Sequence, residues 1–382
     1  MIYFDNAATS FPKPRCVVKA VTDSLVSLGG NPGRGGHTMA INAAKAVYKA
    51  RKTAAELFCL TAEENVIFTQ NCTHALNLVI YGVLEQGDRV VISDLEHNSV
   101  WRPLCSLESK GLIELVVAET SLDNPAHTVA SFERAITPET KLVICTHASN
   151  VTGTVLPIKE IAAVAHKNNA MFAVDGAQSA GMVELDMTAM QIDFLCLPGH
   201  KGLYGPAGTG MLLIGNSCLL EPLMKGGTGS LSQNCCMPDF YPDRLECGTL
   251  NIMGICGLHA GMEFVKNKGI SAISSYEHHL ISRLYHCLKE CNGVKLYSSE
   301  PSFGRSVPVI SFNLKGHSGE ETAQFLSDKG FALRGGLHCA PLAHKKLGTL
   351  ERGTARIGLG CFNTVNEVNR FCETIKKLQY GV

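Results

Sequence analysis

The sequence predicts an α/β protein built around a mostly parallel sheet of seven strands. Short runs rich in Val, Ile and Leu recur along the first part of the chain, and the segments between them carry apolar residues at three- and four-residue spacing. Such runs are typical of strands that are buried on both faces of a parallel sheet. At 382 residues, with 45% hydrophobic and 18% charged residues, the chain is long enough to bury a large core.

The strands are expected where the apolar runs lie. In chain order they are VIFT (66–69), RVVISD (89–94), IELVVAE (113–119), KLVICTHAS (141–149), MFAVDGA (171–177), DFLCLPG (193–199) and GMLLIG (210–215). Helices are expected between them, most clearly at 41–58 and 158–169. Because strands and helices alternate, we expect helices on both faces of the sheet.

A smaller α+β domain is expected towards the C-terminal end. Helical patterns dominate from about residue 258, at 257–269, 272–293, 319–330 and 364–379, with a short strand at 306–314. We therefore assign residues 15–257 to a large domain, and residues 1–14 and 258–382 to a small one.

The composition argues against several classes of function. The 34 Lys and Arg residues equal the 34 Asp and Glu residues, so no basic excess is available for nucleic acid or anionic lipid. The first residues lack a leader pattern, and no apolar run approaches the roughly 18 residues of a membrane span, so we expect a cytoplasmic protein. The 16 cysteines include no C-x-x-C pair, which favours reduced thiols over a disulfide scaffold or a metal site.

Polar residues follow five of the predicted strands. In open α/β sheets, ligands bind beyond the carboxyl ends of the strands. Capping or turn formation would explain each residue alone, but their convergence predicts a site at one edge of the sheet. They are Asn71, Cys72, Thr73 and His74; Glu96, His97 and Asn98; Asn150; Asp175 and Gln178; and His200 and Lys201.

This set has a chemical logic. A lysine such as Lys201 can form an imine with an aldehyde cofactor, and a carboxylate such as Asp175 can keep a pyridine nitrogen protonated. A helix that begins after Asn71 would offer free backbone N–H groups to a phosphate.

Longer motifs resemble the cysteine desulfurase and selenocysteine lyase group of pyridoxal-phosphate enzymes, in the class-V aminotransferase branch of fold type I. The resemblance spans nearly the whole chain. The motifs are FDNAAT (4–9), RGGHT (34–38), VDGAQ (174–178), GHKGLYGPAGTG (199–210), ECGTLN (246–251), RGGLHCAP (334–341) and RIGLGCFNTVNEV (356–368).

The resemblance implies pyridoxal 5'-phosphate as the cofactor and a role for each matching residue. Lys201 would form the imine, Asp175 would contact the ring nitrogen, Gln178 the ring hydroxyl, and His97 the ring face. The remaining cofactor contacts would come from Cys72, Thr73, Asn150 and His200, with Thr249 supplied by the partner subunit. That last contact implies a homodimer with shared active sites.

The resemblance also implies the second half of the reaction. Cys339, on a glycine-rich loop with Arg334 and His338 nearby to favour a thiolate, would take sulfur from L-cysteine as a persulfide and leave L-alanine. The short loop around Cys339 resembles the second desulfurase group. Arg356 could be a surface strand residue, but the resemblance makes it the clamp for the substrate carboxylate.

In the same scheme Arg334 and Asn150 would assist substrate binding, Lys201 would move the Cα proton, and His97 would carry protons. A sulfur-acceptor protein is a further partner that the resemblance allows.

Three alternatives remain open. L-selenocysteine would follow a similar path, which would make the protein a selenocysteine lyase. A different class-V aminotransferase or lyase reaction would not need Cys339. A non-catalytic sulfur-relay protein is the third reading, since Pro198 stands where many relatives carry a serine and offers a phosphate neither a hydroxyl nor an N–H.

Overall fold

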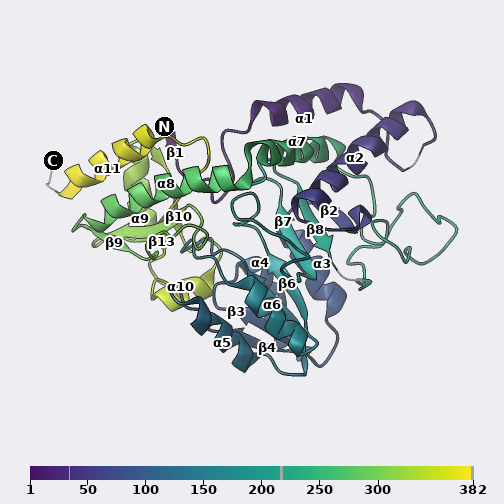
Figure 1. The fold of residues 1–382 in the computed structure, drawn as a ribbon, viewed down its shortest axis with the longest axis horizontal. Coiled ribbons are helices and arrows are strands. Elements are labelled where there is room, and N and C mark those ends of the chain that lie inside the picture. Colours follow the sequence, from purple (N-terminus) through teal and green to yellow (C-terminus); the bar gives the residue numbers. More distant parts are fainter. Residues whose placement is uncertain (34, 216–217, 380–382) are drawn as a thin grey trace.

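The computed structural model describes residues 1–33, 35–215 and 218–379, and Figure 1 shows their arrangement. Arg34, the first residue of the RGGHT motif, lies outside the described residues. No helix within these ranges is long and apolar enough to cross a membrane.

The predicted seven-stranded sheet is confirmed. Its strand order is β2-β8-β7-β6-β5-β3-β4; β8 runs antiparallel to both of its neighbours, and the strands from β7 to β4 are parallel. The strands are β2 (Val66–Thr69), β3 (Asp88–Ser93), β4 (Ile113–Ala118), β5 (Thr140–Thr146), β6 (Met171–Asp175), β7 (Phe194–Pro198) and β8 (Gly210–Ile214).

Helices cover both faces of this sheet, because successive strand residues point to opposite sides. Val143 of β5 packs in one core cluster, whereas the next residue, Ile144, packs in the other. The first cluster includes residues of α2 (Thr38–Leu57), α5 (Pro125–Ala135), α6 (Ile158–Lys167) and α7 (Ile252–Lys268). The second includes residues of α3 (Cys72–Val83) and α4 (Asn98–Ser109). Helix α1 (Arg15–Ser27) lies along α7 (Figure 1).

The C-terminal part forms its own α+β unit with a separate core. Its antiparallel sheet has the order β12-β13-β10-β9, and the short β1 pairs with β11, which brings the first residues of the chain into this unit. Phe4, Phe331 and Phe371 pack together in its core. The strands are β1 (Ile2–Tyr3), β9 (Val294–Leu296), β10 (Val309–Leu314), β11 (Phe331–Ala332), β12 (Arg334–Gly336) and β13 (Thr354–Gly358). The helices are α8 (Ile270–Lys289), α9 (Gly319–Asp328), α10 (Pro341–Leu347) and α11 (Val365–Gln379).

The division between the two units remains a proposal. The boundary suggested at 257/258 falls inside α7, which is continuous from Ile252 to Lys268 and packs on α1 and α2 of the large unit. We therefore place the division nearer Gly269, between α7 and α8, where a positive φ of 83° marks the change of direction.

Candidate active site

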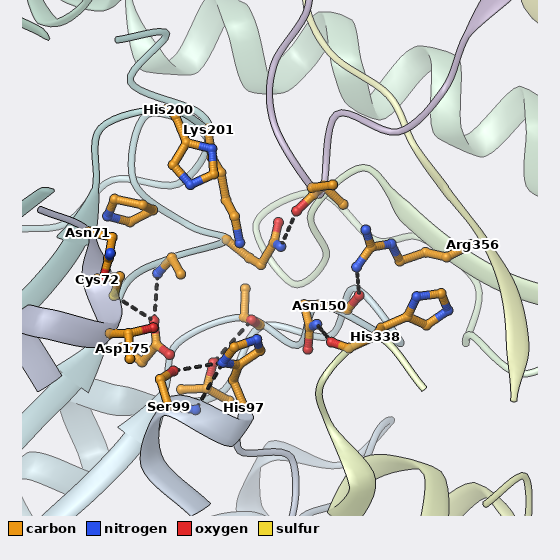
Figure 2. A pocket seen from close by; sticks show the side chains of 18 of the residues that line it. Asn71, Cys72, His97, Ser99, Asn150, Asp175, His200, Lys201, His338 and Arg356 are labelled. Carbon is orange, nitrogen blue, oxygen red and sulfur yellow. Dashed lines mark hydrogen bonds between the residues drawn. The ribbon is translucent and has the colours of Figure 1, made fainter. Parts of the chain in front are cut away.

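A pocket of about 220 Å³ lies where the carboxyl ends of the central strands meet the C-terminal unit (Figure 2). It collects most of the residues that the sequence predicts for the site, but not His74, Glu96, Asn98, Thr249 and Cys339. Those that line it are Asn71, Cys72, Thr73, His97, Asn150, Asp175, Gln178, His200, Lys201, Arg334 and Arg356.

Asp175 and Lys201 reach this pocket from neighbouring strands. Asp175 ends β6 and is 2% exposed; its Oδ1 accepts a hydrogen bond from the backbone N–H of Ala177 at 2.9 Å. The Cys72 thiol lies 3.5 Å from the same oxygen. Because burial raises the pKa of Cys72 well above its usual value, the thiol keeps its proton and donates a hydrogen bond to Asp175. Lys201 extends into the pocket, where burial lowers the pKa of its amine and Asp175 opposes that shift.

His97 is held at the start of α4 as a neutral imidazole. Its Nδ1 accepts a hydrogen bond from the backbone N–H of Ser99 at 3.1 Å and lies 2.7 Å from Ser99 Oγ. Burial lowers the pKa of His97. A neutral ring whose Nδ1 accepts from a backbone amide carries its proton on Nε2, which leaves that proton available for a ligand.

The first turn of α3 offers an anion-binding site. Asn71 caps this helix by accepting a hydrogen bond from the N–H of His74 at 2.9 Å, and the N–H groups that open a helix have no partner within it. This turn packs directly against Gly210 of β8. A Cβ at that position would lie 2.6 Å from the carbonyl carbon of Asn71, so a larger residue would push the turn away. His200 faces the same pocket, and burial lowers its pKa to about 4, so the ring is neutral at pH 7.

Arg356 is buried at the junction of the two units rather than on a surface strand. Its side chain is among the largest that are fully buried, at 1% exposure. Nη1 donates to the carbonyl oxygen of Asn150 at 3.1 Å, and Nη2 pairs with Asp5 Oδ1 at 3.0 Å. These two contacts hold the guanidinium plane at the pocket wall, opposite Arg334 on the neighbouring strand β12.

Cys339 lies just outside the pocket lining, on the loop that follows β12. The side chain is partly exposed, and its Sγ lies 4.0 Å from Nη2 of Arg334, which does line the pocket. The carbonyl oxygen of Cys339 accepts a hydrogen bond from the N–H of Asn98 at 2.7 Å, which fastens this loop beside His97. Both His338 and Cys339 adopt positive φ angles, of 49° and 59°.

The expectation that His338 would favour a thiolate at Cys339 is wrong. Its Nε2 lies 2.9 Å from the carbonyl oxygen of Thr354, and burial holds the pKa of His338 far below its usual value. The ring is therefore neutral and engaged with the neighbouring strand, which leaves Arg334 as the cation beside the thiol.

Thr249 is exposed and does not line the pocket of its own chain; its Oγ1 accepts a hydrogen bond from Asn31 Nδ2 at 3.3 Å. The role assigned to it in a partner subunit stays a prediction.

Sequence reasoning missed two supporting residues, Ser99 and Asp5, and named a third, Glu96, only as a polar residue at the end of a strand. Ser99 orients His97, Asp5 orients Arg356, and Glu96 lies fully buried beside the strand ends. Asp5 belongs to the FDNAAT motif, and Glu96 and Ser99 flank His97, so all three were adjacent to a recognised signal.

The Glu96 carboxyl is a neutral group at pH 7. Its Oε1 accepts hydrogen bonds from Ser93 Oγ at 2.5 Å and from the N–H of Thr146 at 2.7 Å, and burial raises the pKa of Glu96 to about 8. It thereby joins the end of β3 to the end of β5.

We expect Glu96→Gln to flatten the pH dependence of stability between about pH 4.5 and 8. In this window the folded state keeps a proton that the unfolded state loses, so the free energy of unfolding of the unmodified chain falls as pH rises. The measurement is urea unfolding across that range, with the exposed Glu133→Gln as the control. Parallel curves for the unmodified and Glu96→Gln chains would contradict a protonated Glu96.

The unsatisfied atoms in the pocket fit the cofactor that the motifs imply. Gln178 Oε1, His200 Nδ1 and Arg356 Nε are buried and have no hydrogen-bond partner among the described residues. Buried polar atoms are normally paired, so this set indicates a polar ligand. Four groups suit pyridoxal 5'-phosphate: Gln178 Oε1 could accept from its hydroxyl, the N-terminus of α3 could bind its phosphate, and Lys201 and Asp175 could bind its aldehyde and its ring nitrogen. The guanidinium of Arg356 suits a carboxylate substrate.

Comparison with known proteins gives consistent matches. The chain is 33% identical to a probable cysteine desulfurase of Methanothermobacter thermautotrophicus, over 99% of this chain and 94% of that protein. It is 32% identical to a cysteine desulfurase of Synechococcus elongatus, covering all of this chain but 61% of that longer protein.

Solved structures agree with these matches. The apo cysteine desulfurase of Thermococcus onnurineus superposes with a TM-score of 0.91 at 33% identity, over 100% of this chain and 95% of that one. The cysteine desulfurase CsdA of Escherichia coli superposes with a TM-score of 0.87 at 26% identity, with the same coverage. The model of the aminotransferase class-V family matches residues 2–371. This chain therefore belongs to the class-V aminotransferase family, with the fold-type I architecture that the resemblance of its motifs implies.

Proposed function

We propose that the protein is a pyridoxal-phosphate-dependent cysteine desulfurase, which converts L-cysteine to L-alanine and leaves a persulfide on Cys339. The observation that carries this proposal is one pocket that joins Lys201, Asp175 and Arg356, with a partly exposed thiol beside its Arg334 wall. The names of the relatives support the same activity.

The cofactor would be held by groups that enter the pocket from separate strands. Asp175 would contact the ring nitrogen, Gln178 the ring hydroxyl, and Thr73 with the first N–H groups of α3 the phosphate. When bound, pyridoxal phosphate supplies an electron sink for cleavage of bonds at the substrate Cα. Burial lowers the pKa of Lys201, which increases the neutral amine needed both for covalent attachment and for removal of a proton.

L-Cysteine would be oriented by its carboxylate. The Arg356 guanidinium is held on one side by Asp5 and Asn150, while its Nε has no partner among the described residues. A planar fork of this kind binds a carboxylate through two hydrogen bonds. With the carboxylate bound in this way, the Cα proton would face Lys201 and the sulfur would face Cys339. The Nε2 of His97 would be available to carry a proton.

Cys339 would then attack the substrate sulfur as a thiolate. A new S–S bond forms between the two sulfur atoms as the bond from sulfur to the substrate Cβ breaks, and the carbon skeleton leaves as L-alanine after protonation. Arg334, with its Nη2 4.0 Å from Sγ, supplies the positive charge beside the thiol.

We also propose a homodimer, with Thr249 serving the site of the second copy. Helices α1 and α2 and the long loop after β8 lie at one end of the molecule (Figure 1). Large apolar side chains are exposed on these segments, and a concentration of this kind marks a protein interface. They are Val18, Leu25 and Val26; Met39, Ile41 and Tyr48; and Leu219, Leu223, Met224, Leu231 and Phe240.

Lys201→Ala should remove the covalent attachment of the cofactor. Borohydride treatment of the purified holoenzyme should fix pyridoxal to the unmodified chain and leave none on the variant, as measured by intact-protein mass spectrometry. A variant that still carries reduced cofactor would place the attachment at another amine.

Cys339→Ser should abolish sulfide release from L-cysteine in the presence of a reducing thiol, while the cofactor absorbance stays unchanged. The serine hydroxyl keeps nearly the same volume but cannot hold sulfane sulfur. Cys59→Ser, at an exposed thiol in the turn that follows α2, is the control. Sulfide release that persists at the rate of the control would rule out the persulfide step.

Arg356→Lys should raise the KM for L-cysteine about ten- to a hundredfold, because a charged hydrogen bond contributes roughly 1.5–3 kcal/mol and lysine lacks the fork. Steady-state alanine formation measures this effect, with the exposed Arg352→Lys as the matched control. A KM equal to that of the control would remove Arg356 from substrate binding.

A further inference from the structure

The long loop after β8 carries two adjacent thiols that the pocket described above does not use. Cys235 and Cys236 are both exposed, and their Sγ atoms lie 3.9 Å apart. Free cysteines are usually among the most buried residues, and a thiol reacts only where a second reactant can reach it. An exposed neighbouring pair is therefore a candidate for chemistry rather than packing.

The thiol pair lines a polar cavity of about 580 Å³ with an excess of positive charge. Its charged walls are Glu221, Lys225 and Arg244. Glu221 pairs with Lys225 at 2.9 Å and with Arg244 at 3.1 Å, so one acid faces two cations and one positive charge is left over. That charge favours an anionic sulfur in the cavity, such as the thiolate that attacks in a sulfur transfer.

The loop is tied to the segment that carries Thr249. The N–H of Gly226 contacts Sδ of Met237, the residue that follows the pair, at 3.4 Å. The next residue, Gly227, accepts a hydrogen bond through its carbonyl oxygen from the N–H of Gly248 at 2.9 Å. If Thr249 serves the site of the second copy, these contacts attach the loop of the thiol pair to the segment that meets that copy.

We infer that Cys235 and Cys236 form a second thiol site, which accepts sulfane sulfur from Cys339 of the partner subunit. This inference rests on the proposed desulfurase function and on the homodimer. In the transfer, a thiolate of the pair attacks the terminal sulfur of the Cys339 persulfide. The S–S bond on Cys339 breaks, Cys339 leaves as a thiolate, and the new S–S bond makes a persulfide on the pair with no net oxidation or reduction.

The chain allows this transfer to be followed peptide by peptide. Trypsin cleavage after Lys225 and Arg244 releases residues 226–244, whose only cysteines are Cys235 and Cys236. Cleavage after Arg334 and Lys345 releases residues 335–345, whose only cysteine is Cys339. The holoenzyme is incubated with L-cysteine, alkylated to trap persulfides, digested and analysed by mass spectrometry over time. We expect one added sulfur first on 335–345 and then on 226–244.

Co-expressed mixed dimers test the crossing between subunits. One chain carries Cys339→Ser with the pair intact, and the other carries Cys235→Ser with Cys236→Ser and an intact Cys339. Neither homodimer can relay sulfur, so added sulfur on the cysteine-containing 226–244 peptide requires transfer between chains. Cys16→Ser, at another exposed thiol, is the control in each chain and should leave the labelling unchanged.

The outcomes separate the two proposals. Sulfur on 335–345 but never on 226–244, in either the unmodified or the mixed dimer, overturns the relay and leaves the desulfurase function intact. Added sulfur on peptide 226–244 of a Cys339→Ser homodimer would mean that the pair takes sulfur from solution without Cys339. This result would also overturn the relay. Sulfur on neither peptide overturns the proposed function itself.

Discussion

The parallel register of β5, β6 and β7 is the constraint on which the pocket depends. Thr146 pairs with Asp175, and Asp175 pairs with Cys196, two residues before the end of β7. The three strands therefore end within two residues of one another, and their following residues meet at one edge. The first residue of α3 reaches the same edge, and the Cys72 thiol lies 3.5 Å from Asp175 although the two residues are 103 positions apart. A shift in register would move Asp175 away from Lys201. The Asp175 carboxylate would then no longer reach the ring nitrogen that we propose it contacts.

The second requirement is the docking of the C-terminal unit over that edge. Arg356 belongs to β13, yet its guanidinium is held by Asp5 from the start of the chain and by Asn150 from the end of the central sheet. A buried charge is costly unless it is paired and hydrogen-bonded, so these contacts stabilise the guanidinium in place. The same docking carries Arg334 to the pocket and the Cys339 loop to Asn98. The substrate recognition and sulfur acceptance that we propose would thus arise from one interface.

Burial also sets the charges inside this interface. It lowers the pKa values of His97, His200 and His338 and raises that of Glu96, so all four groups are neutral at pH 7. The charged side chains that remain include Asp175, Arg334 and the ion pair of Arg356 with Asp5, and their interactions are strong because water is largely excluded. A substrate carboxylate would then be attracted mainly by Arg356 and Arg334.

The sequence by itself determined the seven strands, the helices between them and the strand-end positions of Lys201 and Asp175, because apolar periodicity and topology are local or general properties of the chain. Its motifs also pointed to the family. The tertiary structure alone decided that Arg356 is buried rather than a surface strand residue, that His338 turns to Thr354, that α7 runs through the suggested domain boundary, and that Glu96 keeps its proton. Each of these outcomes depends on which distant segments pack together and exclude water, and no local pattern of residues encodes that packing.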